Sequence, residues 1–350
     1  MMSDWLVSTA TQAAERGWAS DRAIRAGIRA LCAQRLRGET RRHGTTGVLV
    51  ERAFIEWLRG CDVAPVPAKA NEQHYELPAA FFELMLGPQL KYSSCWWNAP
   101  ATSLGDAEED ALAETARRAG IGDGMRVLDL GCGWGSLSLW MARHHPGSDI
   151  LAVSNSAAQR RFIEQRAAAL GLRNLMVVTA DMNTFAPGGT FDRVVSVEMF
   201  EHMRNYHVLL ERVASWLAPG GRLFVHVFCH RRYSYVFEEG GAHNWMGRHF
   251  FTGGLMPSAT LLPSVPSRLT LEAQWLWDGR HYERTANAWL ARLDDGHDEA
   301  LRVLATAYGT GMAAIWLQRW RIFLMACAEM FGYDDGSEWG VVHHRFARTK

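Results

Sequence analysis

The spacing of hydrophobic residues changes twice along the chain, and the first part has helical spacing. Ile24 and Ile28, for example, lie one helical turn apart, on one face of an expected helix. A break rich in Pro and Ala follows at 62–70, and a further helix is expected at about 78–86. We therefore predict that residues 1–98 form an N-terminal helical region.

From about residue 106, amphipathic helical segments alternate with short apolar segments. The apolar segments share the length and the β-branched content of buried strands; they are "MRVLDLG", "DILAVSN", "LMVVTAD", "FDRVVSVE" and "RLFVHVF". Strands that alternate with helices predict parallel pairing through crossover helices. Residues 99–230 are therefore expected to form an α/β core with a doubly wound, Rossmann-like sheet.

The alternation stops after about residue 230. Residues 231–336 are first rich in aromatic residues and loops and then helical around Trp316, so we expect an insertion here. The segment "EWGVVHHRF" alternates again and predicts that 337–350 contribute a closing strand to the core sheet.

Composition limits the classes of function. The chain has 350 residues, 37 basic and 37 acidic side chains and a pI near 7.2, so it lacks the basic footprint of a general nucleic-acid binder. Its six cysteines include no C-x-x-C pair, which favours free thiols over structural zinc. The sequence starts without a secretory pattern and contains no run of eighteen apolar residues. We therefore expect a cytoplasmic protein without stable membrane insertion.

The segment "VLDLGCGWGS" joins an apolar strand to a glycine loop and a helix. Asp129, Gly131 and Gly133 lie in this loop, where glycines allow a nucleotide-like ligand to approach the backbone. Dinucleotide enzymes and methyltransferases both use such a loop. The third glycine comes one residue too early for the dinucleotide spacing.

The next two strands favour S-adenosyl-L-methionine (SAM) over a dinucleotide. The second strand ends in Ser154 and Asn155, with Gln159 beyond, where a dinucleotide enzyme would have an acidic residue. Asp129 suits the cationic amino-acid end of SAM, and Asp181 could accept a hydrogen bond from the adenine amino group. We predict a SAM site with S-adenosyl-L-homocysteine as the product.

The segment "VEMFEHM" holds two carboxylates and an imidazole. On a helix Glu198, Glu201 and His202 would share one side. Two imidazoles at i, i+4 are absent, so no metal is expected. A solvated helix start would also explain the acids. The cluster follows the fourth parallel strand, however, and ligands bind at this carboxyl edge, so a functional site is favoured.

Several longer segments carry a family resemblance. They are "HYELPAAFFELMLGPQLKYSSCWW", "VLDLGCGWGSLSLW", "VEMFEHMRNY", "HVFCHRRYSYVFEE", "RHFFTGGLMPSATLL", "GRHYERTANAWLARL" and "WLQRWRIFLMACAEMFGY". Over roughly residues 15–348 the chain resembles the cyclopropane-fatty-acyl-phospholipid synthase superfamily, most closely its coclaurine N-methyltransferase branch. The resemblance implies a class I methyltransferase with an N-terminal helical lid and an α-rich substrate-binding insertion before the last strand.

The resemblance also implies roles for residues around the cofactor. Tyr92 and Ser93 would close over its methionine part, and Gly131 and Gly133 would line it. Ser154, Asn155 and Gln159 would hold its ribose. Asp181, Met182 and Val197 would frame the adenine and the sulfonium.

Two positions depart from the cyclopropane synthases. Those enzymes have a cysteine where Ser94 stands, which helps to hold a bicarbonate ion that serves as catalytic base, and a glycine where Glu198 stands. Their remaining ion-holding positions match Glu201, His226, Phe228 and Tyr282, with an aliphatic residue normally at the position of Phe228. The bicarbonate site is therefore expected to be incomplete, whereas "EMFEHM" matches the N-methyltransferase branch.

An amine must lose a proton to attack a methyl group, which gives the cluster its expected roles. We assign Glu198 to binding the substrate nitrogen and His202 to accepting the proton, while Glu201 either shares this role or orients its neighbours. The expected substrate pocket adds a set of mainly aromatic residues: Ser94, Trp97, His226, Phe228, Phe251, Tyr282, Trp320 and Phe323. For any single tryptophan, however, ordinary core packing is the favoured role.

Two further side chains each have two alternative environments. His230 fits a pocket wall and a surface turn equally well. Glu329 lies in an apolar helix, where an unpaired carboxylate is costly, so it either pairs with Arg319 or Arg321 or faces the substrate; pairing is favoured.

The sequence thus predicts SAM-dependent N-methylation of a small, aromatic or alicyclic amine. The alternative enzyme is a cyclopropane-fatty-acyl-phospholipid synthase or lipid C-methyltransferase that acts on unsaturated acyl chains. A cofactor-binding protein without catalysis is the non-enzymatic alternative. The expected partner is the amine alone, without nucleic acid, and a homodimer is left open.

Overall fold

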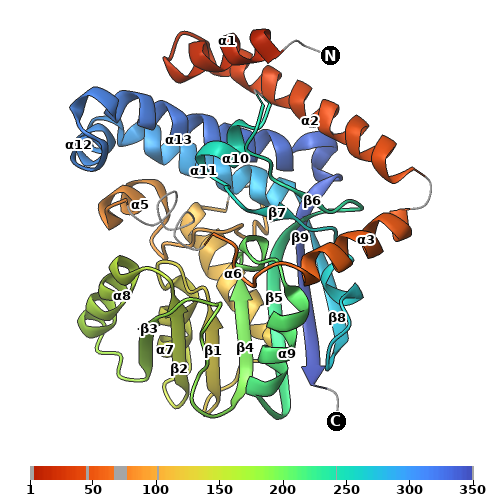
Figure 1. Ribbon diagram of the computed structural model, residues 1–350. Coiled ribbons are helices and arrows are strands. Elements are labelled where there is room, and N and C mark those ends of the chain that lie inside the picture. Colours follow the sequence, from red (N-terminus) through yellow and green to blue (C-terminus); the bar gives the residue numbers. More distant parts are fainter. Residues whose placement is uncertain (1–3, 45–46, 67–76, 101, 242, 349–350) are drawn as a thin grey trace.

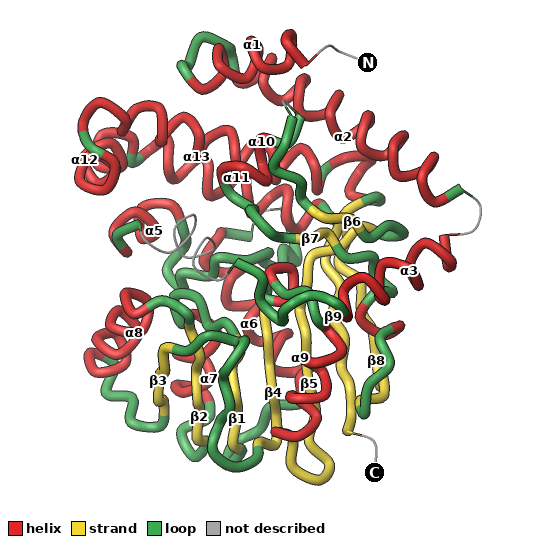
Figure 2. The backbone as a smooth tube through the Cα atoms, in the orientation of Figure 1, coloured by secondary structure: helices red, strands yellow, loops and turns green. Residues whose placement is uncertain are grey.

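The computed structural model describes the chain except residues 1–3, 45–46, 67–76, 101, 242 and 349–350. Part of the predicted break at 62–70 therefore lies outside the described residues. Figure 1 shows a sheet with helices on both faces and a layer of further helices above the carboxyl ends of its parallel strands. Figure 2 shows that this upper layer combines segments from both ends of the chain.

A seven-stranded sheet has the order β3-β2-β1-β4-β5-β9-β8. The first five strands along the chain pair in parallel, and β9 is antiparallel to both of its neighbours. The strands are β1 (Arg126–Leu130), β2 (Asp149–Ser154), β3 (Leu175–Thr179), β4 (Phe191–Val197), β5 (Leu217–His230), β8 (Leu269–Asp278) and β9 (Trp339–Arg348). The doubly wound α/β fold predicted from the alternation of strands and helices is confirmed.

The crossover helices pack on both faces of the sheet, because parallel strands need a connection that returns across a face. They are α7 (Ser136–His144), α8 (Ala157–Ala169) and α9 (Tyr206–Trp216), whereas α6 (Leu104–Ala119) precedes β1 and packs beside α7. Helix α6 begins with a capping box between Ser103 and Asp106 and ends at Gly120 in the left-handed conformation. Its end is thereby set by local sequence.

The edge strand β8 differs from the prediction. It lies inside the range 231–336 that we expected to be an insertion, yet it pairs with β9 in the core sheet. Most of its side chains are exposed or only partly buried. A strand at an edge needs no continuous apolar run, so the pattern did not reveal it. The rest of this range is mainly helical.

The upper layer contains the remaining helices and a two-stranded sheet. These elements are α1 (Asp4–Glu15), α2 (Asp21–His43), α3 (Gly47–Arg59), α5 (Ala79–Met85), β6 (Tyr235–Val236), α10 (Trp245–His249), β7 (Leu255–Met256), α11 (Arg280–Asp295), α12 (His297–Tyr308) and α13 (Thr310–Phe331). Short 3₁₀ helices lie at η1 (Phe200–His202), η2 (Leu262–Ser264) and η3 (Tyr333–Gly336). Helix α13 is buried on several sides and packs against α2, α11 and α12.

Glu329 in α13 does not pair as expected. Its two carboxylate oxygens contact Arg25 at 2.9 Å and Arg29 at 2.7 Å, both in α2. Arg319 and Arg321 instead pair with other acidic residues. The long-range packing of α2 on α13 thus supplies the partners, and local sequence carries no signal for it.

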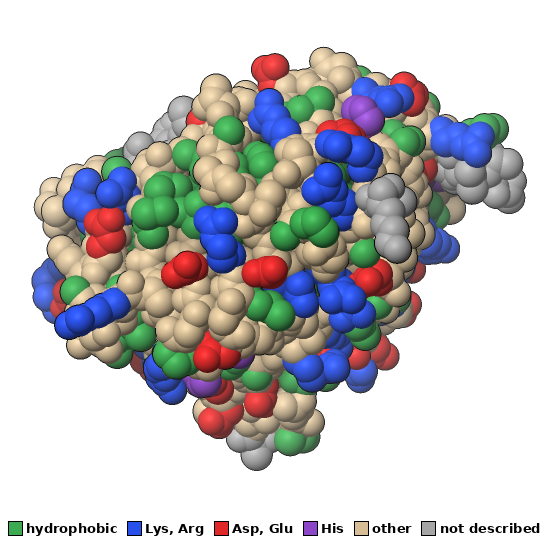
Figure 3. Space-filling model, turned by 90° about the horizontal axis from the view of Figure 1, so that it is seen from below, with side chains coloured by type: hydrophobic (Ala, Val, Ile, Leu, Met, Phe, Trp, Pro, Cys, Tyr) green, Lys and Arg blue, Asp and Glu red, His purple; other side chains and the backbone are tan. Residues whose placement is uncertain are grey.

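The charge distribution on the surface and the lengths of the helices concern the expectations about nucleic acid and membrane. Acidic and basic side chains are interspersed on the face seen from below (Figure 3). Among the described residues no single helix is long and apolar enough to cross a membrane, although α12 and α13, bent by 120° at their junction, pass the same test of length and composition together.

Candidate active site

A pocket of about 740 Å³, open to solvent, lies at the carboxyl edge of the parallel strands. Several residues singled out from the sequence line it: Gly131, Gly133, Ser154, Asn155, Gln159, Met182, Glu198 and His202. The glycine loop, the end of β2, the end of β3 and the cluster after β4 therefore meet at one site.

The glycine loop brings bare backbone to the pocket wall. Gly131 has φ +80°, and a Cβ atom there would lie 2.6 Å from Cγ of Met199. Gly133 also has a positive φ of +52°. A side chain at Gly131 would collide with Met199, which itself lines the pocket, so the packing of this wall requires the glycine.

The end of β2 offers polar groups to the same pocket. Ser154 donates a hydrogen bond to Oε1 of Gln159 at 2.7 Å, and Ser156 caps the N-terminus of α8. The Nε2 atom of Gln159 is buried and has no hydrogen-bond partner among the described residues. A buried donor on a pocket wall is costly unless a ligand or water accepts from it. Ser154, Asn155 and Gln159 therefore offer polar groups that could hold a hydroxylated ligand.

Other residues predicted to bind the cofactor do not line this pocket. Asp129 is buried and accepts a hydrogen bond from Ser138 at 2.5 Å, and burial raises its pKa to about 6. It faces α7, so the expectation that its carboxylate meets the cationic end of SAM finds no support in this geometry. Asp181 is exposed and accepts from the backbone N–H of Asn183. Tyr92, Ser93 and Val197 are absent from the described pocket wall.

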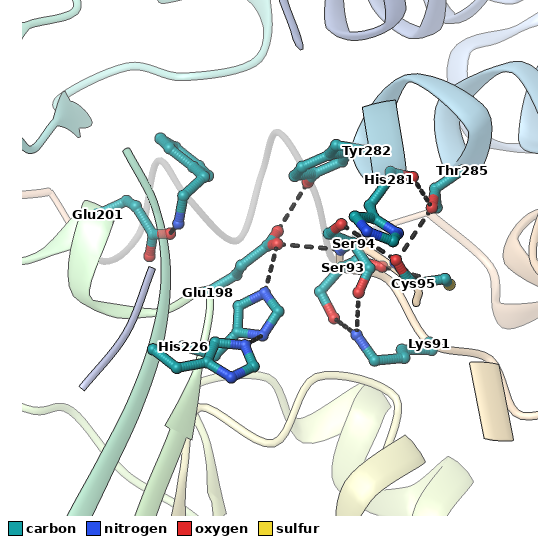
Figure 4. A network of polar contacts seen from close by, with 12 residues as sticks. Lys91, Ser93, Ser94, Cys95, Glu198, Glu201, His226, His281, Tyr282 and Thr285 are labelled. Atoms are coloured by element: carbon teal, nitrogen blue, oxygen red, sulfur yellow. Dashed lines mark hydrogen bonds and ion pairs between the residues drawn. The ribbon is translucent and has the colours of Figure 1, made fainter. Parts of the chain in front are cut away.

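Glu198 does not lie on a helix, contrary to the expectation from its spacing. It follows β4 directly and has φ +49°, in the left-handed region. The helix that follows is only the short η1, which contains Glu201 and His202. The three side chains therefore do not share one helical face, and Figure 4 shows the Glu198 and Glu201 carboxyl groups pointing to different partners.

The Glu198 carboxylate accepts hydrogen bonds from three segments far apart in the sequence (Figure 4). The backbone N–H of Ser94 donates at 3.0 Å, Nε2 of His226 lies at 3.1 Å, and the Tyr282 hydroxyl donates at 2.7 Å. Burial raises the pKa of Glu198, but the hydrogen bond with His226, the Lys91 ammonium and the Ser94 N–H outweigh it and lower the pKa. The side chain, 9% exposed, is therefore a carboxylate at the pocket wall.

Glu201 has a different environment and a different protonation state. Its Oε1 accepts from the backbone N–H of Phe228 at 2.8 Å, whereas Oε2 is buried with no hydrogen-bond partner among the described residues. Burial and the nearby Glu198 charge raise the pKa of Glu201 well above its usual value. The hydrogen bond from Phe228 ties η1 to β5, and the raised pKa is consistent with an orienting role for Glu201.

Lys91 was not expected from the sequence. It is buried, and its ammonium donates to Oγ of Ser93 and to the backbone carbonyl of Ser94, both at 2.6 Å. These bonds fix the segment whose N–H contacts Glu198 (Figure 4). A lysine beside polar small residues carries no sequence signature of this role.

Aromatic rings surround the cluster. His202 is half-buried and stacks on Phe251, with ring centroids 4.8 Å apart. Phe251 contacts Phe228 edge-on, and Tyr282 stacks on Phe331 at 4.2 Å. Phe331 also contacts Phe228 edge-on at 6.2 Å, so the predicted residues Phe228, Phe251 and Tyr282 belong to one aromatic cluster beside the described pocket. Phe331, which was not predicted, links them.

Three predicted substrate residues lie in other environments. The indole of Trp97 donates to Thr285, and the Arg284 guanidinium lies over its ring. Trp320 is fully buried among Phe81, Phe82 and Phe250, and Phe323 stacks on Phe250. None of the eight predicted substrate residues lines the described pocket. For Trp320 and Phe323, core packing explains the position.

His230 is also buried rather than on a surface turn. Its Nδ1 accepts from the backbone N–H groups of Arg232 and Tyr233. The other residues of the pocket wall were missed because they are small or apolar and carry no chemical signal; they are Ala64, Val66, Val153, Ala180, Met199, Met203 and Thr252. No group of His, Cys, Asp or Glu that could hold a metal occurs among the described residues.

The strand order, the glycine loop and the pocket at the carboxyl edge define a class I SAM-dependent methyltransferase. Residues 65–337 match the model of the mycolic acid cyclopropane synthetase family, and the chain belongs to this family. (S)-coclaurine N-methyltransferase of Thalictrum flavum subsp. glaucum is 36% identical over 295 residues, which are 83% of this chain and 82% of that protein.

Two further relatives place the chain within the family. The cyclopropane-fatty-acyl-phospholipid synthase of Escherichia coli (strain K12) is 29% identical over 284 residues, 79% of this chain and 67% of that protein. The crystal structure of coclaurine N-methyltransferase bound to N-methylheliamine and S-adenosylhomocysteine has a TM-score of 0.93 at 32% identity and covers 97% of this chain and 98% of that chain. The protein is a SAM-dependent enzyme of the coclaurine N-methyltransferase branch.

Proposed function

We propose that the enzyme methylates the nitrogen of a small aromatic or alicyclic amine, which Glu198 binds in its ammonium form. The observation that carries this proposal is the ionised, nearly buried Glu198 carboxylate on the pocket wall. A carboxylate at low exposure attracts an ammonium group far more strongly than one in water. The similarity to (S)-coclaurine N-methyltransferase and its amine-bound structure supports the same substrate class.

Glu198 and His202 have different proposed roles toward the amine. Glu198 orients the nitrogen, and its lowered pKa makes it a weak base. His202 lies on the same pocket wall and is the candidate proton acceptor. When bound, SAM supplies an electrophilic methyl group, so the pocket needs chiefly to align the nitrogen and exclude water. The rings of Phe228, Phe251 and Tyr282 suit the apolar part of such an amine.

The position of Glu198 also argues against the lipid reaction. The family resemblance implies that a cyclopropane synthase holds bicarbonate at the positions of Ser94, His226 and Tyr282. Here the Glu198 carboxylate accepts hydrogen bonds from these three residues. A free bicarbonate ion would have to compete with a covalently attached carboxylate that uses the same donors.

The test measures S-adenosylhomocysteine formation by the purified protein with two substrate sets. One set contains aromatic and alicyclic amines, and the other contains unsaturated phospholipid vesicles with and without bicarbonate. Turnover on amines alone, without dependence on bicarbonate, supports the proposal. Turnover on vesicles alone, or dependence on bicarbonate, would favour the lipid reaction.

Two histidine variants test the proton acceptor. His202→Asn should lower the rate on amines while the affinity for S-adenosylhomocysteine stays close to that of the wild type. His207→Asn is the matched control, because His207 lies on α9 and contacts the Pro266 carbonyl away from the pocket. Equal rates for both variants would remove His202 from the mechanism.

A further inference from the structure

A buried series of hydrogen bonds lies behind Glu198 and leads away from the pocket. Nε2 of His226 lies 3.1 Å from the Glu198 carboxylate, and Nδ1 of His226 lies 2.8 Å from Nε2 of His343. Nδ1 of His343 lies 2.9 Å from Nη1 of Arg118 in α6. The two histidines are direct partners in the pairing of β5 with β9. One residue on each of three elements therefore stands in line behind the carboxylate.

The chemistry of these groups fixes the direction of every bond in the series. A guanidinium only donates, so Nδ1 of His343 must accept from Arg118. A neutral imidazole has one donor and one acceptor, so Nε2–H of His343 donates to Nδ1 of His226. By the same rule Nε2–H of His226 donates to Glu198. Both histidines are fully buried, and burial lowers the pKa of His226 to about 4 and that of His343 well below its usual value, which keeps both rings neutral.

We propose that Arg118 and His343 are positioning residues that hold His226 in the Nε2–H tautomer and thereby keep Glu198 as a carboxylate able to bind the substrate ammonium. The consequence for the amine rests on the proposed function, whereas the tautomers do not depend on it. Arg118 itself is held by Glu114 through its Nε at 2.5 Å and by the ring of Trp277 beneath its guanidinium. The anchor of the series is therefore fixed in place.

The opposite tautomer of His226 would destabilise the ionised form of Glu198. With a proton on Nδ1, the lone pair of His226 Nε2 would face the carboxylate at 3.1 Å, and one of its donors would be lost. This repulsion would raise the pKa of Glu198 and weaken its hold on an ammonium group. The other titratable or charged groups that face Glu198 come from the surrounding loop and helices: Lys91, Cys95, Glu201, Tyr282 and Cys327. Of these, Lys91 brings a positive charge and Tyr282 a hydrogen bond, and both would remain.

The first measurement is the tautomer of each ring by two-dimensional ¹H–¹⁵N NMR on the full-length protein labelled in its histidines, without substrate. We expect Nε2–H for both His226 and His343, each assigned by the signal lost in its Gln variant. An Nδ1–H tautomer at His226, or a doubly protonated ring at neutral pH, would overturn the proposal. Because no substrate is present, this result does not depend on the reaction.

The second measurement is the pH profile of kcat/KM for an amine substrate in three variants. His343→Leu removes both hydrogen bonds, and we expect the acid limb to move up by about one pH unit, with a roughly tenfold loss below it. His343→Gln can still accept from Arg118 and donate to His226, so it should restore the wild-type profile. His344→Leu is the matched control, because this buried neighbour points to the other side of β9 and contacts the Ala259 carbonyl.

The outcomes separate positioning from simple stability. Equal profiles for His343→Leu and the control would overturn the proposal, as would a His343→Gln variant as impaired as His343→Leu. If His343→Leu fails to fold, Arg118→Met replaces it and should produce the same shift of the acid limb with unchanged affinity for S-adenosylhomocysteine. Failure of the proposed function would appear instead as absence of amine turnover in the wild type.

Discussion

Replacing Glu198 by Gln would remove a charge from the pocket wall and keep the shape of the side chain. The amide oxygen can still accept from the Ser94 N–H and from His226. The Tyr282 hydroxyl, which now donates to the carboxylate, can turn and accept from the amide nitrogen. We therefore expect the free energy of unfolding to change by about 1 kcal/mol or less.

The effect on the amine should be much larger. Truncating one member of a desolvated charge pair costs about 3–4 kcal/mol. This corresponds to a fall of about 10²- to 10³-fold in kcat/KM for the amine. Because the proposed contact of Glu198 with the substrate forms before the methyl group is transferred, much of the change should appear in KM. The affinity for S-adenosylhomocysteine should stay within about threefold of the wild-type value.

Initial rates of S-adenosylhomocysteine formation at varied amine concentration measure this change, and calorimetric titration measures the product affinity. Glu329→Gln is the matched control, because it removes another nearly buried carboxylate, which pairs with Arg25 and Arg29 away from the pocket. It should lower stability and leave kcat/KM intact. If Glu198→Gln kept kcat/KM within tenfold of the wild type, the reasoning from its charge would be refuted.

The other predictions concern the cofactor, the carboxylate donors and acid stability. Gly131→Ala should weaken S-adenosylhomocysteine binding at least about tenfold, since its Cβ would meet Met199, whereas Gly124→Ala, with φ +80° and open space around it, should change only stability. Glu198→Gly should lose amine turnover, and added formate should restore part of it by binding the freed donors; no recovery would contradict the donor arrangement. The free energy of unfolding should fall as the pH drops from about 6.5, because six buried or half-buried histidines have folded-state pKa values below those of the unfolded chain. They outnumber the buried carboxyls with a raised pKa, such as Asp129. These histidines are His226, His230, His249, His281, His343 and His344, and a flat profile in urea unfolding between about pH 6.5 and 5 would contradict this.

Most of the fold followed from the hydrophobic pattern because burial on both faces imposes it. Strands β1 to β5 are apolar runs, and β9 is buried over most of its length. The strand β8 was missed because an edge strand with many exposed side chains has no such constraint. The partners of Glu329 were missed for another reason: they come from α2, about three hundred residues away in the sequence.

The parts of the site that carry a sequence motif could be located from the sequence. The parts whose conformation depends on tertiary contacts could not. The glycine loop and the end of β2 were located from the sequence because their spacing is tied to strand ends. The conformation of Glu198 was not, because a left-handed glutamate has no local signal. His343 left a partial signal: in a strand of period two, His343 and His344 must face opposite sides, so only one of them could reach the site.

The left-handed conformation of Glu198 links the local backbone to the chemistry. A glutamate at φ +49° costs about 1–2 kcal/mol relative to the right-handed region, so the surrounding structure must outweigh this cost. Three hydrogen bonds to the carboxylate, from three separate segments, provide the compensation. The resemblance to cyclopropane synthases implies a glycine at this position, which adopts such a conformation without strain. A single substitution at a backbone position suited to glycine can therefore attach a carboxylate where a free anion would otherwise bind, and the strain is concentrated at the residue that we propose binds the amine.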